Sequence, residues 1–165
     1  MKNNPVISIL CLALGAIGTL SCAPVNVAGN YVGTVTNGEN GCAIANWNVG
    51  AIYRNVRFSV MTTTMANVTA TLDGAPGALL GSFTTNNETL RGGVTGNTFV
   101  VRRVGFAPLT RGNCAYTASG DVESTISGNT VTGQIIYHYQ TNRMSDCAEL
   151  ITCRSVQQYE FARVQ

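Results

Sequence analysis

The chain has 165 residues, with 10 lysines and arginines against 8 aspartates and glutamates, so its net charge is small. No cluster of basic residues offers a footprint for nucleic-acid phosphates, and 45% hydrophobic residues are too many for a disordered chain. Charged residues make up only 11%, and Thr, Ser, Asn and Gly stand in their place. That composition favours exposed β-strands and turns over surface helices.

The first 22 residues have the pattern of an export signal. Lys2 precedes an apolar run from Val6 to Leu20, and Ser21 and Cys22 follow. The run is too short to cross a bilayer as a helix, which needs about 20 residues. A cysteine directly after such a run resembles the lipobox of bacterial lipoproteins. The resemblance implies that the thiol of Cys22 carries lipid, such as palmitate, and that Cys22 begins the mature chain.

This resemblance divides the chain into a signal peptide over 1–21, an anchor linker over 22–28 and a β-barrel domain over 29–165. Thr19 departs from the Leu, Val or Ile usual three places before the lipidated cysteine. Ala23 follows Cys22, as in lipoproteins sorted to the outer membrane of Gram-negative bacteria. We therefore expect a protein anchored in the cell envelope, on the extracytoplasmic side. Ordinary secretion, with a cut after Ala23, is the alternative.

Four more cysteines follow in the exported part, namely Cys42, Cys114, Cys147 and Cys153. An even number in an exported domain indicates two disulfides, with three ways of pairing them. We predict Cys147–Cys153 and Cys42–Cys114, each contributing about 2–4 kcal/mol by restricting the unfolded chain. A zinc site of four cysteines is the alternative, but zinc ligands usually come in more closely spaced pairs.

The exported part alternates between apolar and polar residues with a period of two, which is typical of half-buried antiparallel strands. Val56, Phe58 and Val60 share one face of such a segment, and no helical pattern of useful length follows Cys22. The predicted strands are 30–37, 55–64, 67–73, 78–85, 88–95, 97–104, 113–126, 130–140 and 155–163.

Turn dipeptides separate these strands. Gly96-Asn97 and Gly128-Asn129 suit two-residue hairpins, and Asn37-Gly38 is also a turn dipeptide. Loops are expected at 74–77 and 105–112, and the longest connections, 38–54 and 141–154, both contain cysteines. Eight or nine strands in succession predict an up-and-down antiparallel β-barrel, because closure removes exposed edges. A two-sheet β-sandwich is the alternative.

Two resemblances accompany this fold prediction. Gly29-Asn30-Tyr31 resembles the Gly-x-Trp opening of lipocalin-like barrels, with tyrosine in place of tryptophan. The mature chain is also similar to small bacterial lipoproteins that have Asn-Gly-x-x-Gly-Cys and Asn-Trp after the first strand, here 37–42 and 46–47. These proteins end with two close cysteines and an aromatic strand. The resemblance implies a disulfide-stapled β-domain and no particular activity.

Few residues suit catalysis. His138 is the one histidine, and its alternation with Tyr137 and Tyr139 places it on the polar face of its strand. Asp121 and Glu123 share a strand face about 6.5–7 Å apart, within the range of about 5–9.5 Å found for glycosidase carboxylates. A surface hydrolase using this pair is therefore one alternative, and it requires a raised pKa for one carboxyl group in a polar cleft.

The leading prediction is a non-catalytic envelope protein that acts as an interaction module or binds a small apolar ligand. Phe58, Tyr116, Tyr137 and Tyr139 are the candidate lining of such a site, with His138 outside it. The alternative for these aromatic residues is that they fill a packed barrel. No metal or cofactor is expected, and a purely structural role in the envelope is the third alternative.

Overall fold

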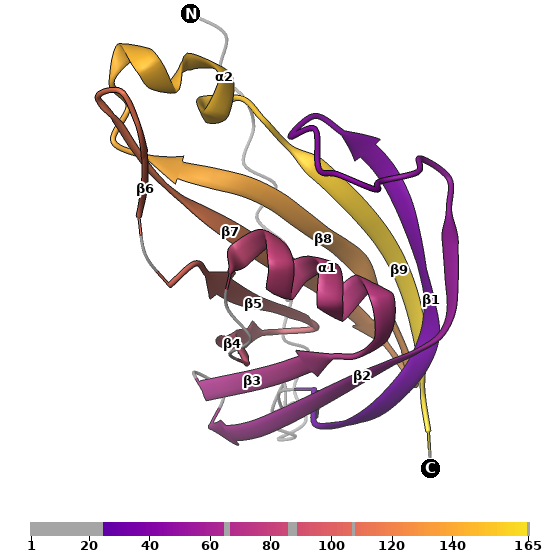
Figure 1. Cartoon of the computed structure of the whole chain (residues 1–165). Helices are drawn as coiled ribbons and strands as arrows, with labels where there is room; N and C mark the ends of the chain where they lie inside the picture. Colours follow the sequence, from indigo (N-terminus) through magenta and orange to yellow (C-terminus); the bar gives the residue numbers. More distant parts are fainter. Residues whose placement is uncertain (1–24, 65–66, 86–88, 107, 165) are drawn as a thin grey trace, which may run out of the picture.

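The computed structural model describes residues 25–64, 67–85, 89–106 and 108–164 (Figure 1). The predicted signal peptide and Cys22 lie outside these ranges. Within them the chain forms nine strands and two short helical segments besides one longer helix. The strands are β1 (Gly29–Asn40), β2 (Ile52–Thr64), β3 (Asn67–Leu72), β4 (Leu90–Thr95), β5 (Thr98–Val104), β6 (Leu109–Arg111), β7 (Cys114–Ser127), β8 (Thr130–Thr141) and β9 (Ser155–Arg163).

Eight of these strands close into an antiparallel barrel, which confirms the predicted fold and not the sandwich. Strand β1 pairs with β2, β2 with β3, β3 with β4, and β4 with β5. Strand β5 then pairs with β7, and β7, β8 and β9 continue the sheet. Pairing of β1 with β9, from Tyr31 opposite Arg163 to Asn40 opposite Ser155, closes the ring. Strand β6 lies outside the ring and extends β7 at one corner of the molecule, beside α2 (Ala148–Ile151) (Figure 1).

Two predicted hairpin turns are confirmed at one end of the barrel. Gly96 and Gly128 each have a φ near +60°, a conformation that glycine adopts without steric cost. Each glycine joins two strands, β4 to β5 and β7 to β8. The predicted turn at Asn37-Gly38 is wrong, because both residues continue β1.

The segment predicted as strand 78–85 and the preceding loop 74–77 are instead the helix α1 (Gly74–Thr84). Its sequence is a short apolar run that also contains glycine and alanine, and periodicity alone does not distinguish such a run from a strand. Leu80 is fully buried and packs on Gly120 of β7, where a side chain would collide with it. The helix thereby covers one opening of the barrel (Figure 1).

The two ends of the barrel are therefore different. We call the end with the Gly96 and Gly128 turns the turn end, and the end covered by α1 the helix end. At the helix end, Phe83 of α1 contacts Tyr137 and Tyr139, which lie near the end of β8 that is distant from the Gly128 turn. Among the described residues, no helix combines the length and the apolarity needed to cross a membrane.

The middle of the barrel is packed with aromatic side chains. The ring of Phe58 lies 6.0 Å from that of Phe99 and 5.3 Å from that of Phe161. All three are almost fully buried, as is Tyr31. Small eight-stranded barrels are usually filled in this way, so the interior around Phe58 is core.

A buried polar chain crosses the barrel nearer the helix end. Tyr137 donates a hydrogen bond to Gln157 at 2.7 Å, and Gln157 donates one to Asn37, also at 2.7 Å. The Asn37 amide in turn donates to the carbonyl oxygen of Asn48 at 3.1 Å. Hydrogen bonding offsets the cost of burying these groups and ties the 41–51 loop to the barrel.

The disulfides are Cys42–Cys153 and Cys114–Cys147, so the predicted pairing is wrong. Cys42 follows β1 and Cys153 precedes β9, and these strands are neighbours in the closed ring, which brings the two Cα atoms to 4.7 Å. Cys114 begins β7 and meets Cys147 in the connection between β8 and β9. All four sulfurs are consumed in disulfides, so none is a thiolate ligand for zinc.

Candidate functional site

An open recess of about 740 Å³ lies at the helix end, between the outward face of α1 and the segment 42–46. We call it the α1 recess. Most of its lining residues are apolar or aromatic, but Asn46, Ser82 and the hydroxyl groups of Tyr53 and Tyr139 also belong to it, so its exposed surface contains polar as well as apolar atoms. The other lining residues are Cys42, Ala43, Ile44, Ala45, Ala75, Ala78, Leu79 and Phe83.

Helix α1 has no charged side chain on any face. Ala75, Ala78 and Ser82 are exposed on its outer side, and Leu79 and Phe83 are half-buried there. A surface helix normally presents charged or polar residues to water, and an apolar outer face is typical of a covered helix. The helix therefore gives the recess a wall that favours apolar atoms.

Aromatic side chains form the other wall of the recess. The ring of Tyr139 lies 5.2 Å from that of Phe83 and 5.4 Å from that of Tyr116. Burial and the neighbouring Tyr116 raise the pKa of Tyr139, so its hydroxyl stays neutral. Trp47 packs edge-on against Tyr137 at 5.4 Å, and its indole N–H donates to the carbonyl of Gly38 at 3.0 Å. These contacts hold the 41–51 loop in place beside the recess.

The four predicted lining residues occupy different places. Tyr139 lines the recess, and the ring of Tyr116 packs edge-on against that of Tyr139 without lining the recess itself. Tyr137 is fully buried beneath Phe83, and Phe58 belongs to the packed core, so neither lines a cavity. The sequence analysis missed the contribution of α1. An uncharged run containing Leu79, Leu80 and Phe83 was the signal that could have identified it.

Asp121 lies on the outer face of the barrel, where two cationic or potentially cationic groups hold its carboxylate. Arg102 donates from Nε and Nη2 to the two carboxylate oxygens at 2.6 and 2.8 Å. His138 Nε2 lies 3.2 Å from Oδ2, on the outer face as predicted. Burial by itself raises the pKa of Asp121, but the hydrogen bonds to His138 and Arg102 outweigh it and bring the pKa to about 2.

This cluster does not have the order of a catalytic triad. Ser119 donates to Asp121 at 3.4 Å, so the carboxylate stands between the serine and the histidine. In a triad the histidine stands between the other two and takes the proton of the hydroxyl. Ser119 is also fully buried, which keeps its hydroxyl from a substrate. The cluster thus holds a permanent carboxylate and fastens β5, β7 and β8 together.

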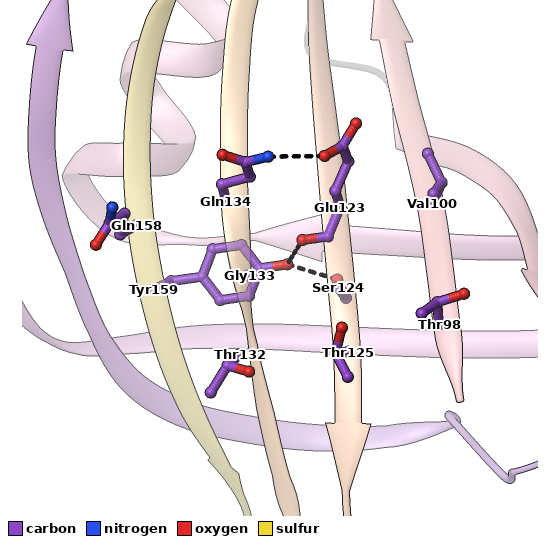
Figure 2. A pocket seen from close by; sticks show the side chains of 10 residues that line it. All are labelled: Thr98, Val100, Glu123, Ser124, Thr125, Thr132, Gly133, Gln134, Gln158 and Tyr159. Carbon is purple, nitrogen blue, oxygen red and sulfur yellow. Dashed lines mark hydrogen bonds between the residues drawn. The ribbon is translucent and has the colours of Figure 1, made fainter. Parts of the chain in front are cut away.

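Glu123 lies further along the same face and has separate partners. Its carboxylate accepts a hydrogen bond from Gln134 at 2.8 Å. It lines a shallow depression of about 600 Å³, whose other polar residues include Thr98, Thr125 and Gln158. Figure 2 shows the side chains of these residues. Asp121 does not line this depression, so the two predicted carboxylates do not share one cleft.

Tyr159 crosses beneath the same depression. Figure 2 shows its ring passing over Gly133 of β8 to reach β7, where its hydroxyl meets the hydroxyl of Ser124 and donates to the carbonyl of Glu123 at 2.9 Å. Burial raises the pKa of Tyr159. The tyrosine is therefore a neutral, satisfied structural group below the surface.

The described part of the chain contains no group of three or more His, Cys, Asp or Glu residues that could hold a metal ion. Comparison of the chain with protein-family models, with curated proteins and with solved structures finds no match. The α1 recess and the Asp121 cluster must therefore be interpreted from their own geometry.

Proposed function

We propose that this protein is a non-catalytic, lipid-anchored protein of the bacterial cell envelope that binds a small apolar ligand in the α1 recess. The observation that carries the proposal is the uncharged outer face of α1 at a recess of about 740 Å³. Sites for small molecules are lined mainly by apolar and aromatic groups, and the α1 recess, although open to solvent, has mostly apolar and aromatic residues in its lining.

The composition of the lining indicates the class of ligand. Ile44, Leu79 and Phe83 provide apolar surface. The hydroxyl groups of Tyr53, Tyr139 and Ser82 and the amide of Asn46 are the polar side-chain groups of the lining. No charged side chain lines the recess to hold an ionic group. An acyl chain or a comparable hydrocarbon fits this chemistry, because burying it removes apolar surface from water at about 25 cal/mol per Å².

The pKa of about 2 for Asp121 means that this residue does not serve as the general acid of a glycosidase. A glycosidase needs a carboxyl group that is still protonated near neutral pH, so that it can act as the general acid. Asp121 is instead ionised throughout that range. Its bonds to Arg102 and His138 give the carboxylate a structural role in joining three strands.

Binding of the fluorescent fatty acid cis-parinaric acid tests the recess. The wild-type protein should bind it saturably, and Ala78→Phe should abolish binding by filling the recess with a ring. Ala78 is exposed, so the larger side chain requires no repacking of the core. Ala162→Phe is the matched control, since Ala162 is an exposed alanine on the outer face of β9. The site would be refuted if the wild-type protein did not bind the fatty acid, or if Ala78→Phe and Ala162→Phe reduced its binding equally.

The anchor has a separate test. Radiolabelled palmitate fed to bacteria expressing the full chain should enter the wild-type protein and not Cys22→Ser. Cys11→Ser is the control, because it removes another cysteine of the same leading segment. Equal labelling of the wild type and Cys22→Ser would show that Cys22 carries no lipid.

A further inference from the structure

Residues 25–28, part of the predicted anchor linker, are docked on the turn end of the barrel. Tyr31 donates from its hydroxyl to the carbonyl of Val27 at 2.8 Å, and Val27 is almost fully buried in the core. Arg163 donates to the carbonyl of Asn26 at 2.6 Å and to the Tyr31 hydroxyl at 2.8 Å. The guanidinium also lies 5.3 Å from the centre of the Tyr31 ring.

These contacts fix the point at which the chain leaves the barrel. Arg163 also donates its backbone N–H to the carbonyl of Asn129, in the turn between β7 and β8, at 2.8 Å. The docked segment is therefore at the turn end. Four residue steps separate Asn26 from Cys22, and a fully extended chain spans at most about 14 Å over that length.

The turn end has the chemistry of a surface that can lie on lipid headgroups. The segments 95–98 and 127–130 are Thr-Gly-Asn-Thr and Ser-Gly-Asn-Thr, without a carboxylate, and Arg163 adds a positive charge beside them. The helix end carries charged groups of both signs, namely Glu39, Asp146 and Glu149 together with Arg111, Arg143 and Arg154. The two ends therefore differ in the number of charged groups and not in the sign of their charge, and the turn end presents mainly uncharged polar groups to a headgroup layer.

We propose that this short, docked tether holds the turn end of the barrel against the lipid surface, so that the helix end and the α1 recess face away from the membrane. The inference rests on the lipid at Cys22 from the proposed function. Its partner is the headgroup layer of the membrane in which the lipid is inserted. The recess would then be open to a ligand delivered from the aqueous side.

Tryptophan fluorescence tests this orientation on the intact, lipidated protein. Trp47 is the one tryptophan of the chain and lies at the helix end. The full-length protein, extracted with its anchor, is reconstituted into phosphatidylcholine vesicles with and without phosphatidylcholine that has a nitroxide on its headgroup. The nitroxide should leave the emission of Trp47 unchanged. Asn129→Trp places a second indole in the β7–β8 turn. The headgroup nitroxide should quench the emission that this indole adds.

Gln140→Trp is the matched control, because Gln140 is exposed on the same hairpin but at the helix end. Its added emission should be retained. Quenching of Trp47 or of the Gln140→Trp indole, or retained emission from Asn129→Trp, would overturn the proposal. A flexible Gly-Ser insertion after Pro24 should restore the Asn129→Trp emission, and unchanged quenching would show that the tether does not set the orientation.

Flotation of the same vesicles separates the two proposals. If the protein floats with the vesicles but is quenched at the wrong end, the anchor stands and the orientation is wrong. If the protein does not float, the lipid anchor itself fails, and the inferred orientation fails with it.

Discussion

The two disulfides close loops of very different length, and this difference predicts how much each contributes to stability. Cys42 and Cys153 are separated by 111 residues in sequence, and Cys114 and Cys147 by 33. A disulfide restricts the unfolded chain more strongly when it closes a longer loop. The perturbations are the paired substitutions Cys42→Ala with Cys153→Ala, and Cys114→Ala with Cys147→Ala.

The loop-entropy relation converts these separations into free energies of about 4.8 and about 3.7 kcal/mol at 25 °C. Removing the Cys42–Cys153 bond should therefore lower the free energy of unfolding by about 1 kcal/mol more than removing the other bond. Both variants should keep the barrel, because the sulfur atoms are replaced by small apolar groups and the strand pairing is untouched.

Equilibrium unfolding in guanidinium chloride, followed by circular dichroism, measures both differences. The slope of the unfolding free energy against denaturant should rise in each variant, since the unfolded chain exposes more surface without the crosslink. Equal native spectra are the control for an intact fold. A larger loss on removing Cys114–Cys147 would refute the reasoning. A Cys147–Cys153 peptide in a non-reducing digest would refute the pairing.

Three further outcomes follow from the geometry. Asp121→Asn should lower the free energy of unfolding by about 1–2 kcal/mol at pH 7, after allowance for solvent screening at the half-exposed Arg102. Because the pKa of about 2 in the folded protein lies below the ordinary value of 3.8 for an aspartate, acid titration should remove this difference between about pH 4 and pH 2. Gly133→Ala should lower the midpoint of thermal unfolding, since a Cβ at Gly133 would meet the Glu123 carbonyl and lie 2.6 Å from the Tyr159 hydroxyl, and an unchanged midpoint would contradict this close packing. Phe58→Ala should cost about 3–5 kcal/mol in denaturant unfolding, and a cost below about 1 kcal/mol would contradict a packed interior.

The barrel could be predicted from the sequence because several of its strands alternate between apolar and polar residues. Val131, Ile135 and Tyr137 face inward, and His138 faces outward, as the period of two requires. Helix α1 could not be predicted in the same way, because its residues have no apolar stripe at either period. Leu80 of the helix packs on Gly120 of β7, and the sequence does not show that tertiary contact.

The disulfide pairing and the recess depend on closure of the barrel. Closure places β1 beside β9, and therefore Cys42 beside Cys153, although these residues are far apart in sequence. The prediction instead joined Cys147 to its nearest neighbour along the chain. The recess likewise combines the loop after β1 with a helix after β3, so Tyr139 could be predicted as lining but its partners could not.

Pairing of the first strand with the last also bears on how the protein is made. Tyr31 lies opposite Arg163, so the final seam of the barrel forms only after nearly the whole chain has left the ribosome. Contacts between residues so distant in sequence form slowly, because a long loop must close first. The barrel therefore cannot close until the last strand has been synthesised. Loss of the last strand would leave β1 and β8 as open edges, the template on which other chains aggregate.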